Sequence, residues 1–416
     1  MSFPRLVKVR QEFPRPRVED VEAKVREELE KERISFRLES GMRVALTAGS
    51  RGISQIDVVL RSLVRALKEK GADPFIVPAM GSHGGATTEG QVEVLKSLGV
   101  TEEFCEAQIF SSMEVAEIGR TQRGVPVYMD HHASKADGVV VVNRIKAHTD
   151  FRGPAESGLL KMAAIGLGKH AAALELHGYG VTGIKDYMIE VGEEVLRSGR
   201  VLFGLGLVEN AYDEPARIEV IEPENVRERE EELLREYMDY MPSLPVKEMD
   251  ILFVDALGKN YSGTGMDTNV IGRFRILGVE EPESPNAKYI IVSRVSDESH
   301  GNTLGAGLAD FTTERFFGAV DRAAMNANVM TSTFVERAKI PMVLENDKEA
   351  LEAAIRCNWG VPPEETRMVR IPNTLHLEHV YLSENLVDEA LENGNVELVG
   401  EAAEPEFDEN GYLKHF

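Results

Sequence analysis

Residues 136–148 read ADGVVVVNRIKAH, an apolar run of valines that ends in polar and charged residues. A short run of β-branched residues bounded by polar ones is typical of a strand buried on both faces of a parallel sheet. Such a strand would deliver Asn143, Arg144, Lys146 and His148 at its carboxyl end. Ligands of open α/β sheets bind beyond the carboxyl ends of the strands, so these side chains are candidates for a site.

Two earlier segments repeat this plan of a strand, a polar loop and an amphipathic helix. RVALTAGSRG at 43–52 precedes one helical pattern, and DPFIVPAMGSHGG at 73–85 precedes another. The second helix is expected to begin near Thr88-Glu89-Gly90-Gln91, which has the spacing of a capping box. The alternation of strands and helices predicts an α/β fold in which the polar strand ends converge.

We expect two α/β domains with a ligand crevice between them, at the carboxyl ends of their strands. The charged stretch 222–240 is typical of an exposed helix, and the prolines of MPSLP at 241–245 mark a boundary after it. A strand and a polar loop recur beyond it, in MDILFVDALGKNYSGTG at 249–265. The expected domains are residues 1–241, carrying the catalytic loops, and residues 246–416, closing over the site.

The composition excludes several classes of protein. The 416-residue chain has a net charge of −23 and no basic stripe with interleaved aromatic residues, so nucleic acid is not an expected partner. Its two cysteines, Cys105 and Cys357, are far apart, which argues against a disulfide scaffold, a zinc ribbon or an iron–sulfur cluster. The N-terminus lacks the apolar core of a signal peptide, and no apolar run approaches the roughly 20 residues that span a bilayer. We expect a cytoplasmic protein without a membrane partner.

The run from Asn143 to Gly178 departs from this acidic background. It reads NRIKAHTDFRGPAESGLLKMAAIGLGKHAAALELHG, with more basic than acidic residues. A locally positive, glycine-rich stretch in an acidic chain predicts a site for a small anionic ligand. The basic residues are Arg144, Lys146, Arg152, Lys161 and Lys169, and the acidic ones are Asp150, Glu156 and Glu175.

Three residues in the strand-end loops suit acid–base chemistry or anion binding. His83 lies in a Gly-Ser-His-Gly-Gly turn that exposes backbone N–H groups, although an incidental histidine in a tight turn is the alternative. His148 stands beside Lys146 and Arg152, which favours a functional histidine over a structural one. Arg51 can bind a carboxylate in bidentate fashion, and a surface arginine is the alternative.

Two further residues depend on each other for their interpretation. Lys161 falls inside SGLLKMAAIG, where a buried ammonium is costly unless it is paired or used chemically; a snorkelling lysine is the alternative. His177 follows a helix-like AAALEL segment. By itself His177 is weak evidence for a metal site, because no second His or Cys stands at a usual metal-binding spacing.

Taken in order, these motifs resemble the nickel-pincer lactate racemase family, whose broader membership racemises or epimerises 2-hydroxy acids. The resemblance covers most of the chain and is strongest over residues 45–180. Four features carry it, and their order and spacing make it stronger than any one motif. They are Ser50-Arg51, the Gly-Ser-His-Gly turn at 81–84, the loop of His148, and Lys161 followed by His177.

The resemblance implies a nickel-pincer nucleotide as cofactor. This pyridinium mononucleotide would be held on Lys161 through a thioamide bond. Its carbon and two sulfur atoms would bind nickel, and His177 would complete the square plane as the one protein ligand. Enzymes that make the cofactor are implied as partners, and protein made without them would be apo.

The implied activity is that of an isomerase, which acts on a small anionic 2-hydroxy acid by proton-coupled hydride transfer through a 2-keto acid. By resemblance, His83 and His148 are the two bases, one for each enantiomer. Ser50 and Arg51 would bind the substrate carboxylate. Lys259 would contact the substrate from the second domain.

The chain departs from the lactate enzymes at the substrate pocket. It has Thr-Ala-Gly-Ser-Arg-Gly at 47–52 where those enzymes carry Asp-x-Thr-Arg-Pro, and its spacing from His148 to Lys161 is longer. These changes predict a substrate other than lactate. Arg152 and Lys146 favour a larger or dicarboxylic hydroxy acid.

Two other functions remain open on the residues alone. One is a non-catalytic anion or nucleotide binder that keeps the fold without the cofactor. The other is a hydrolase or lyase that binds a divalent metal through Asp297, Glu298 and His300. The sequence does not predict an oligomeric state.

Overall fold

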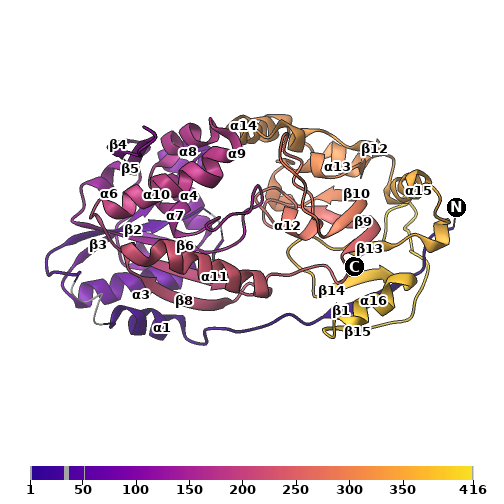
Figure 1. Cartoon of the computed structure of the whole chain (residues 1–416), viewed down its shortest axis with the longest axis horizontal. Coiled ribbons are helices and arrows are strands. Elements are labelled where there is room, and N and C mark those ends of the chain that lie inside the picture. The colour runs from indigo at the N-terminus through magenta and orange to yellow at the C-terminus, as the bar shows by residue number, and fades with distance from the viewer. Residues whose placement is uncertain (1, 32–36, 51, 415) are drawn as a thin grey trace. The chain divides into compact units, whose positions relative to one another are not determined.

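The chain folds into two compact units (Figure 1). The computed structural model describes residues 2–31, 37–50, 52–414 and 416. One unit is Pro14–Met241, and the other combines Met1–Phe13 with Pro242–Phe416. Each unit holds helices and a mainly parallel sheet, so the predicted α/β fold class is confirmed. None of the helices in the described part of the chain is long and apolar enough to cross a bilayer.

The first unit is built on a five-stranded sheet with the order β3-β2-β6-β7-β8. The first four of these strands run parallel, and β8 is antiparallel to β7. A separate antiparallel pair is formed by β4 and β5. The strands are β2 (Arg43–Ala48), β3 (Asp73–Pro78), β4 (Val115–Arg120), β5 (Pro126–Asp130), β6 (Gly138–Arg144), β7 (Val201–Glu209) and β8 (Pro215–Ile221).

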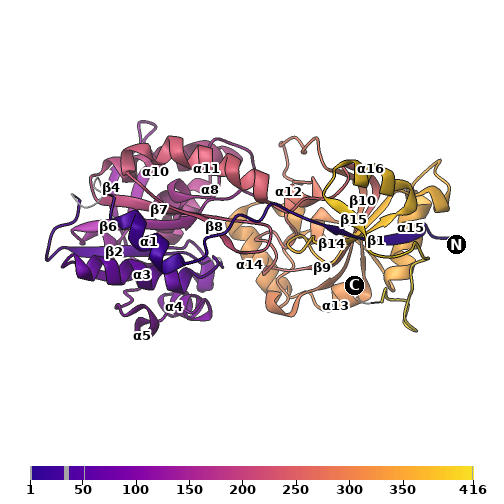
Figure 2. The same cartoon turned by 90° about the horizontal axis from the view of Figure 1, so that it is seen from below.

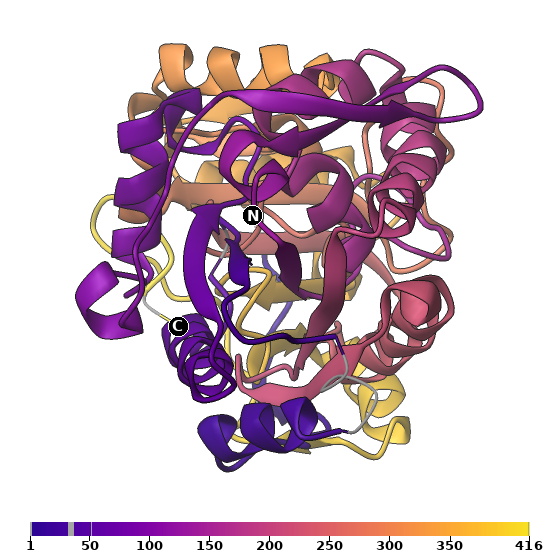
Figure 3. The same cartoon turned by 90° about the vertical axis from the view of Figure 1, so that its left-hand side faces the viewer.

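Helices cover both faces of this sheet (Figure 3). On one face, apolar residues of α1 and α3 form a buried core with β2, β3, β6 and β7. On the other, α7 and α10 contact β7. The helices are α1 (Val21–Leu29), α3 (Ile56–Glu69), α4 (Thr88–Ser97), α5 (Glu102–Cys105), α6 (His131–Ser134), α7 (Leu159–Lys161), α8 (Lys169–His177), α9 (Gly180–Thr182), α10 (Met188–Arg197) and α11 (Val226–Tyr240).

The second unit contains an eight-stranded sheet with the order β12-β11-β10-β9-β13-β14-β1-β15. Strands β9 to β13 run parallel, whereas β14, β1 and β15 continue the sheet in antiparallel fashion. The strands are β1 (Leu6–Gln11), β9 (Glu248–Leu257), β10 (Asn286–Val295), β11 (Phe311–Thr313), β12 (Met342–Leu344), β13 (Met368–Ile371), β14 (His379–Ser383) and β15 (Val396–Leu398). The helices are α12 (Thr268–Ile271), α13 (Glu314–Gly318), α14 (Arg322–Ser332), α15 (Asp347–Cys357) and α16 (Val387–Glu392).

The N-terminal strand crosses the expected domain boundary. Residues 1–241 were expected to form one domain, yet Met1–Phe13 belong to the unit of Pro242–Phe416. The cause is strand pairing, because β1 lies between β14 and β15 (Figure 2). These partners are far away in the sequence, so no local pattern identifies them.

Two local expectations near the site also differ from the structure. The cap of α4 is Thr87, whose hydroxyl accepts from the N–H of Gly90, so the capping-box spacing at Thr88 does not describe the helix start. The side chain of Gln91 points inward instead. In the charged helix α11, Glu230 is buried with 1% of its surface exposed, although this stretch was expected to be exposed.

Candidate active site

Lys161 and His148 meet in the N-terminal part of the chain, within the first unit. Lys161 ends the short helix α7, and a π-helical turn, Met162–Gly166, follows it. The Lys161 Nζ lies 2.8 Å from His148 Nε2. Both residues are partly buried. π-Helical turns often occur at functional sites, because they displace a side chain from its ordinary helical position.

The His148 ring is held by the loop that follows β6. This loop is closed by backbone hydrogen bonds between Lys146 and Ser157, of 2.8 and 3.1 Å. The His148 ring stacks on Phe151 at a centroid distance of 4.6 Å. Its Nδ1 accepts from the N–H of Asp150 at 3.2 Å and lies 3.5 Å from Asp150 Oδ2. The ring is therefore fixed from two sides, with Nε2 directed at Lys161.

Glu156 organises the backbone of the same loop. Its carboxylate accepts from the N–H of His148 at 2.6 Å and from the N–H of Gly153 at 3.0 Å. Burial raises the pKa of Glu156, whereas Arg152 and these two N–H groups act in the opposite direction. The Arg152 Nη1 donates to the carbonyl oxygens of His148 and Phe151, each at 2.8 Å. Arg152 thus braces the loop, which weakens the prediction that it meets a second substrate carboxylate.

His177 has the properties of an available imidazole ligand. It ends α8, and its Nδ1 is buried without a hydrogen-bond partner among the described residues. Burial lowers the pKa of His177; the charge of Asp150 raises it and that of Lys161 lowers it. The ring is therefore favoured in its neutral form, which is the form that binds metals. His177 fits the nickel-ligand role that the resemblance implies, and it shares an electrostatic environment with Lys161.

The His83 turn packs on the segment that joins Lys161 to His177. The hydroxyl of Ser50 hydrogen-bonds to His83 Nδ1. A Cβ placed on Gly81 would lie 3.1 Å from Ala173 Cβ, so this glycine allows the turn to approach α8 closely. The amide of Gln91, which is fully buried, donates to the carbonyl oxygens of Met80 and Gly81 at 3.1 and 3.2 Å.

The Ser50 loop approaches the same segment. A Cβ placed on Gly49 would lie 3.1 Å from the Cε of Met162, the residue after Lys161. Arg51, predicted to bind the substrate carboxylate, lies outside the described residues. On its far side, the loop is anchored by Glu209, which accepts from the N–H of Ser54 at 2.6 Å.

Two cations of the predicted anion pocket are occupied by buried carboxylates. Arg144 is paired with Glu209, and Lys169 lies 3.2 Å from Asp130 Oδ2 with both side chains fully buried. The Lys169 Nζ also donates to the carbonyl oxygen of Pro78 at 2.5 Å. Arg144 and Lys169 therefore add little to the local positive charge expected of this run, because their partners Glu209 and Asp130 lie outside it.

The remaining predicted residues lie in the second unit. Lys259 donates from Nζ to the carbonyl oxygens of Gly263 and Leu304, at 2.9 and 3.4 Å. Among residues 2–31, 37–50, 52–414 and 416, no group of three or more His, Cys, Asp or Glu side chains is arranged to hold a metal ion. The alternative set of Asp297, Glu298 and His300 accordingly does not form such a centre.

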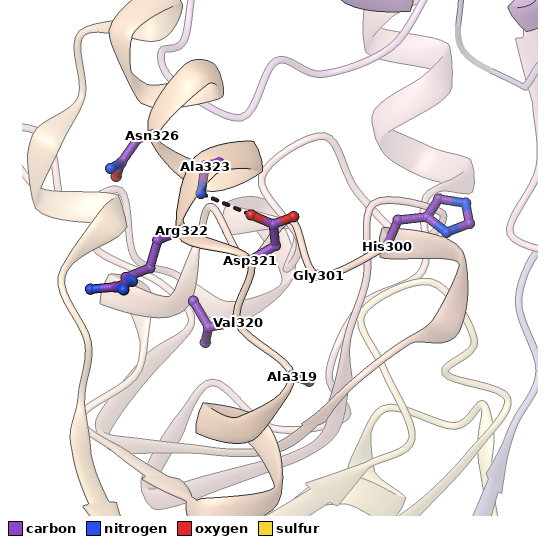
Figure 4. Close-up of a pocket in the computed structure, with 8 residues that line it drawn as sticks. All are labelled: His300, Gly301, Ala319, Val320, Asp321, Arg322, Ala323 and Asn326. Carbon is purple, nitrogen blue, oxygen red and sulfur yellow. Dashed lines mark hydrogen bonds between the residues drawn. The ribbon is translucent and has the colours of Figure 1, made fainter.

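A cavity of about 800 Å³ also lies in the second unit (Figure 4). Its polar side chains His300, Arg322 and Asn326 point in different directions. Asp321 accepts from the N–H of Ala323 at 2.8 Å and caps α14. The cavity contains none of the residues implied by the resemblance.

Several residues around Lys161 were not predicted from the sequence. The carboxylate of Glu230 accepts from the N–H of Leu160 at 3.0 Å, at the start of α7. A Cβ on Gly158 would collide with this carboxyl group, so Gly158 permits the contact. Burial raises the pKa of Glu230 to about 7, although N–H groups of α7 and the charge of Arg227 lower it. Gly158 was the only local sign of this contact, and no pattern in the sequence connects Gly158 to Glu230.

Comparisons with known proteins agree with this arrangement. Residues 5–182 match the model of the lactate racemase N-terminal domain. The lactate racemase apoprotein from Thermoanaerobacterium thermosaccharolyticum is 12% identical, with a TM-score of 0.54 over 89% of this chain and 99% of that one. A protein from Thermotoga maritima is 13% identical, with a TM-score of 0.52 over 85% of this chain and 96% of that one. No curated protein matches the sequence.

The two matches cover more of the chain than the motifs that suggested the resemblance. The family match includes Lys161 and His177 as well as the turn of His83. The predicted resemblance is therefore confirmed: residues 5–182 match the lactate racemase N-terminal domain, and the chain that contains them has a fold similar to that of the lactate racemase apoprotein.

Proposed function

We propose that the protein is an isomerase that racemises or epimerises a 2-hydroxy acid with a nickel-pincer nucleotide held on Lys161. One observation carries the proposal. The Lys161 amine contacts the imidazole of His148 at 2.8 Å and influences the pKa of His177, whose buried Nδ1 has no hydrogen-bond partner in the described part of the chain. A tether, a base and a metal ligand would thus occupy one site.

The residues present fit the implied cofactor. Lys161 would hold it covalently, and His177 would supply the protein ligand to nickel. The chemistry that this group would supply there is reversible hydride transfer with the substrate Cα. The chain itself must bind the carboxylate, orient the Cα–H bond and move the hydroxyl proton.

His83 and His148 suit the proton transfers. Ser50 engages Nδ1 of His83, which assigns Nε2 as the atom that takes the substrate proton. In His148, Nδ1 accepts from the N–H of Asp150, which leaves Nε2 as the atom that would exchange a proton with the substrate. Asp150 would therefore hold the ring of His148 in position through its backbone N–H.

The substrate would be a small 2-hydroxy acid in anionic form. Arg51 would bind its carboxylate, with Ser50 acting mainly through its hydrogen bond to His83. Lys259 would be a second cationic contact. The loop of His148, which is braced by Arg152 and Glu156, would set the space for the substituent on Cα.

The decisive experiment combines mass and stereochemistry. Protein from a host with the cofactor maturation enzymes should carry a covalent adduct on Lys161 and nickel. This preparation is then screened with α-deuterated 2-hydroxy acids in ordinary water. Return of the same hydride predicts that the inverted product keeps its deuterium, whereas proton abstraction would exchange it with solvent.

The same experiment separates the alternatives. An unmodified Lys161 in a competent host supplied with nickel would overturn the proposal and favour a non-catalytic binder. An adduct accompanied by loss of deuterium to water would contradict hydride transfer. Activity that depends on a divalent metal without any adduct would favour a hydrolase or lyase.

A further inference from the structure

The short helix that carries Lys161 takes its cap from a distant helix. Its N-cap residue is Gly158, which has no side chain to accept from the first N–H groups of α7. Glu230 of α11, 70 residues beyond Leu160, accepts instead: its Oε2 lies 3.0 Å from the N–H of Leu160. The N–H of Leu159 faces the same carboxyl group. A Cβ on Gly158 would lie 2.4 Å from Glu230 Oε1, so a local side-chain cap and this contact exclude each other.

The Leu160 peptide is confined on its other side by α10. A Cβ placed on Gly192 would lie 2.7 Å from the carbonyl oxygen of Leu160, so the glycine lets α10 approach this peptide closely. Leu160 is fully buried, whereas the next residue, Lys161, is only partly buried. In a helix the backbone sets the direction of each side chain. A fixed Leu160 peptide therefore fixes the point from which the Lys161 side chain starts.

We propose that Glu230 is a positioning residue for Lys161, which acts through the Leu160 peptide and holds the amine where the cofactor is attached. This inference rests on the proposed function, in which Lys161 is the tether. The amine lies 2.8 Å from His148, whose own backbone N–H is held by Glu156 at 2.6 Å. The lysine and the histidine are thus braced by separate carboxyl groups. Loss of the Glu230 contact should displace the lysine and leave the His148 loop in place.

A cap with a purely structural role accounts less well for Glu230. A Ser, Thr or Asp at the N-cap satisfies the first N–H groups of a helix locally, whereas a buried carboxyl group is costly unless its oxygens are paired. Glu230 has 1% of its surface exposed, and its Oε1 is buried without a hydrogen-bond partner in the described part of the chain. Buried atoms of this kind are uncommon in folded proteins. What the distant carboxyl adds is a tie between α7 and the 15-residue helix α11.

The first test compares variants of the full-length chain in a host with the maturation enzymes. Glu230→Gln keeps an oxygen for the N–H of Leu160, whereas Glu230→Leu fills similar space without an acceptor. Intact mass at one early time after induction gives the fraction of chains with the Lys161 adduct. We expect this fraction to fall by about tenfold in Glu230→Leu, an effect of the order of a lost helix cap. Glu230→Gln should match the native chain.

A second variant reaches the same peptide from the opposite side. In Gly192→Ala the new Cβ would press on the Leu160 carbonyl oxygen, so the adduct fraction should fall here as well. Alanine favours a helix more than glycine does, so this loss would not come from a weaker α10. Gly318→Ala is the matched control. Gly318 lies in α13, and a Cβ there meets no atom within 4 Å.

Hydrogen exchange in the unloaded chain tests the contact without the cofactor. The amides of α7 should exchange about tenfold faster in Glu230→Leu than in the native chain, because their cap is lost, while those of β6 should not change. Glu230→Gln should restore the native rates. Leu233→Ala is the control for weaker packing of α11, because Leu233 packs toward Gly206 of β7. It should not accelerate exchange in α7 more than in β6.

The possible outcomes separate this inference from the proposed function. An equal adduct fraction in Glu230→Leu and the native chain, or exchange in α7 that rises no more than in β6, would overturn the inference alone. Equal losses in Glu230→Gln and Glu230→Leu would also contradict it, because the hydrogen-bond acceptor would then not be what matters. Absence of the adduct from the native chain would instead overturn the proposed function.

Discussion

Lys161 and Lys169 lie in the same apolar run, yet the fold treats them in opposite ways. Lys169 is fully buried, 3.2 Å from Asp130 Oδ2, and donates to the carbonyl oxygen of Pro78. Lys161 is partly buried and contacts an imidazole. From the sequence alone, either residue satisfies the description of a lysine among apolar neighbours. The partners, more than the burial, distinguish the two lysines.

The two lysines differ in the groups that surround their side-chain nitrogens. Burial lowers the pKa of Lys169, and the charge of Asp130 and its hydrogen bond to the lysine act against this shift. An uncompensated charge at that place would be costly, which makes the pair necessary to the fold. Lys161 instead lies beside the imidazole of His148, at 2.8 Å. Removing the two side chains should therefore affect different properties of the protein.

The largest effect is expected from Lys161→Ala in protein made with the maturation enzymes. The cofactor adduct should be absent, and isomerase activity should fall to background, because Lys161 is the proposed tether. The melting temperature should change little, since the side chain is only partly buried. Intact mass, nickel content and thermal unfolding check these three points. Lys135→Ala is the surface control, and an adduct retained in Lys161→Ala would refute the assignment.

Lys169→Ala should reverse this pattern. Asp130 would remain buried without its cation, and breaking a buried pair in this way costs about 3–5 kcal/mol. Urea unfolding should show this loss in the unloaded chain. The double variant Lys169→Ala/Asp130→Asn should recover part of it, because the stranded charge is gone. A single variant as stable as the native chain would mean that the pair does not support the fold.

Sequence reasoning identified the strands of the first unit because their apolar runs are local signals. RVALTA, DPFIVP and GVVVVNR became β2, β3 and β6. It missed the place of β1, because the partners that fix this strand come from the far end of the chain. The order of His83, His148, Lys161 and His177 was enough to suggest the family, although their contacts required the structure.

The supporting residues of the site were not predictable for a different reason. Gln91 stands at a spacing that suits a capping box, but its amide instead holds the carbonyl oxygens of the His83 turn. Glu230 looks like any other acidic residue of a charged helix, and only its contact with Leu160 shows its place. A polar residue that braces a site has the same local pattern as one in solvent. Its role depends on which backbone group the fold places beside it.

Glu230 contacts the residue before Lys161, and its buried carboxyl predicts that the stability of the chain depends on pH. Burial raises the pKa of its carboxyl from 4.5 to about 7, so the folded chain holds this proton more tightly than the unfolded chain does. The free energy of unfolding should therefore fall as the pH rises from about 4.5 to about 7, and then level off. The expected loss is on the order of 3 kcal/mol.

Glu230→Gln isolates this contribution, because glutamine can still accept from the N–H of Leu160 but cannot ionise. The difference in unfolding free energy between this variant and the native chain, measured in urea at several pH values, should grow in favour of the variant as the pH rises. Glu228→Gln, an exchange in the same helix, is the control. Parallel curves for Glu230→Gln and the native chain would show that the carboxyl does not titrate differently in the folded state.

The smallest expected effect comes from Phe151→Leu, which removes the ring stacked on His148. Such aromatic contacts contribute about 0.5–1.5 kcal/mol beyond buried area, so a modest loss of stability is expected. Phe110 stacks on His132 in a similar geometry, with ring centroids 5.3 Å apart against 4.6 Å for Phe151 and His148. Phe110→Leu should therefore cost a similar amount. Only Phe151→Leu should also lower the isomerase activity of the loaded protein, because only that ring fixes the orientation of His148. Equal activities in the two variants would mean that the role of His148 does not depend on this stacking.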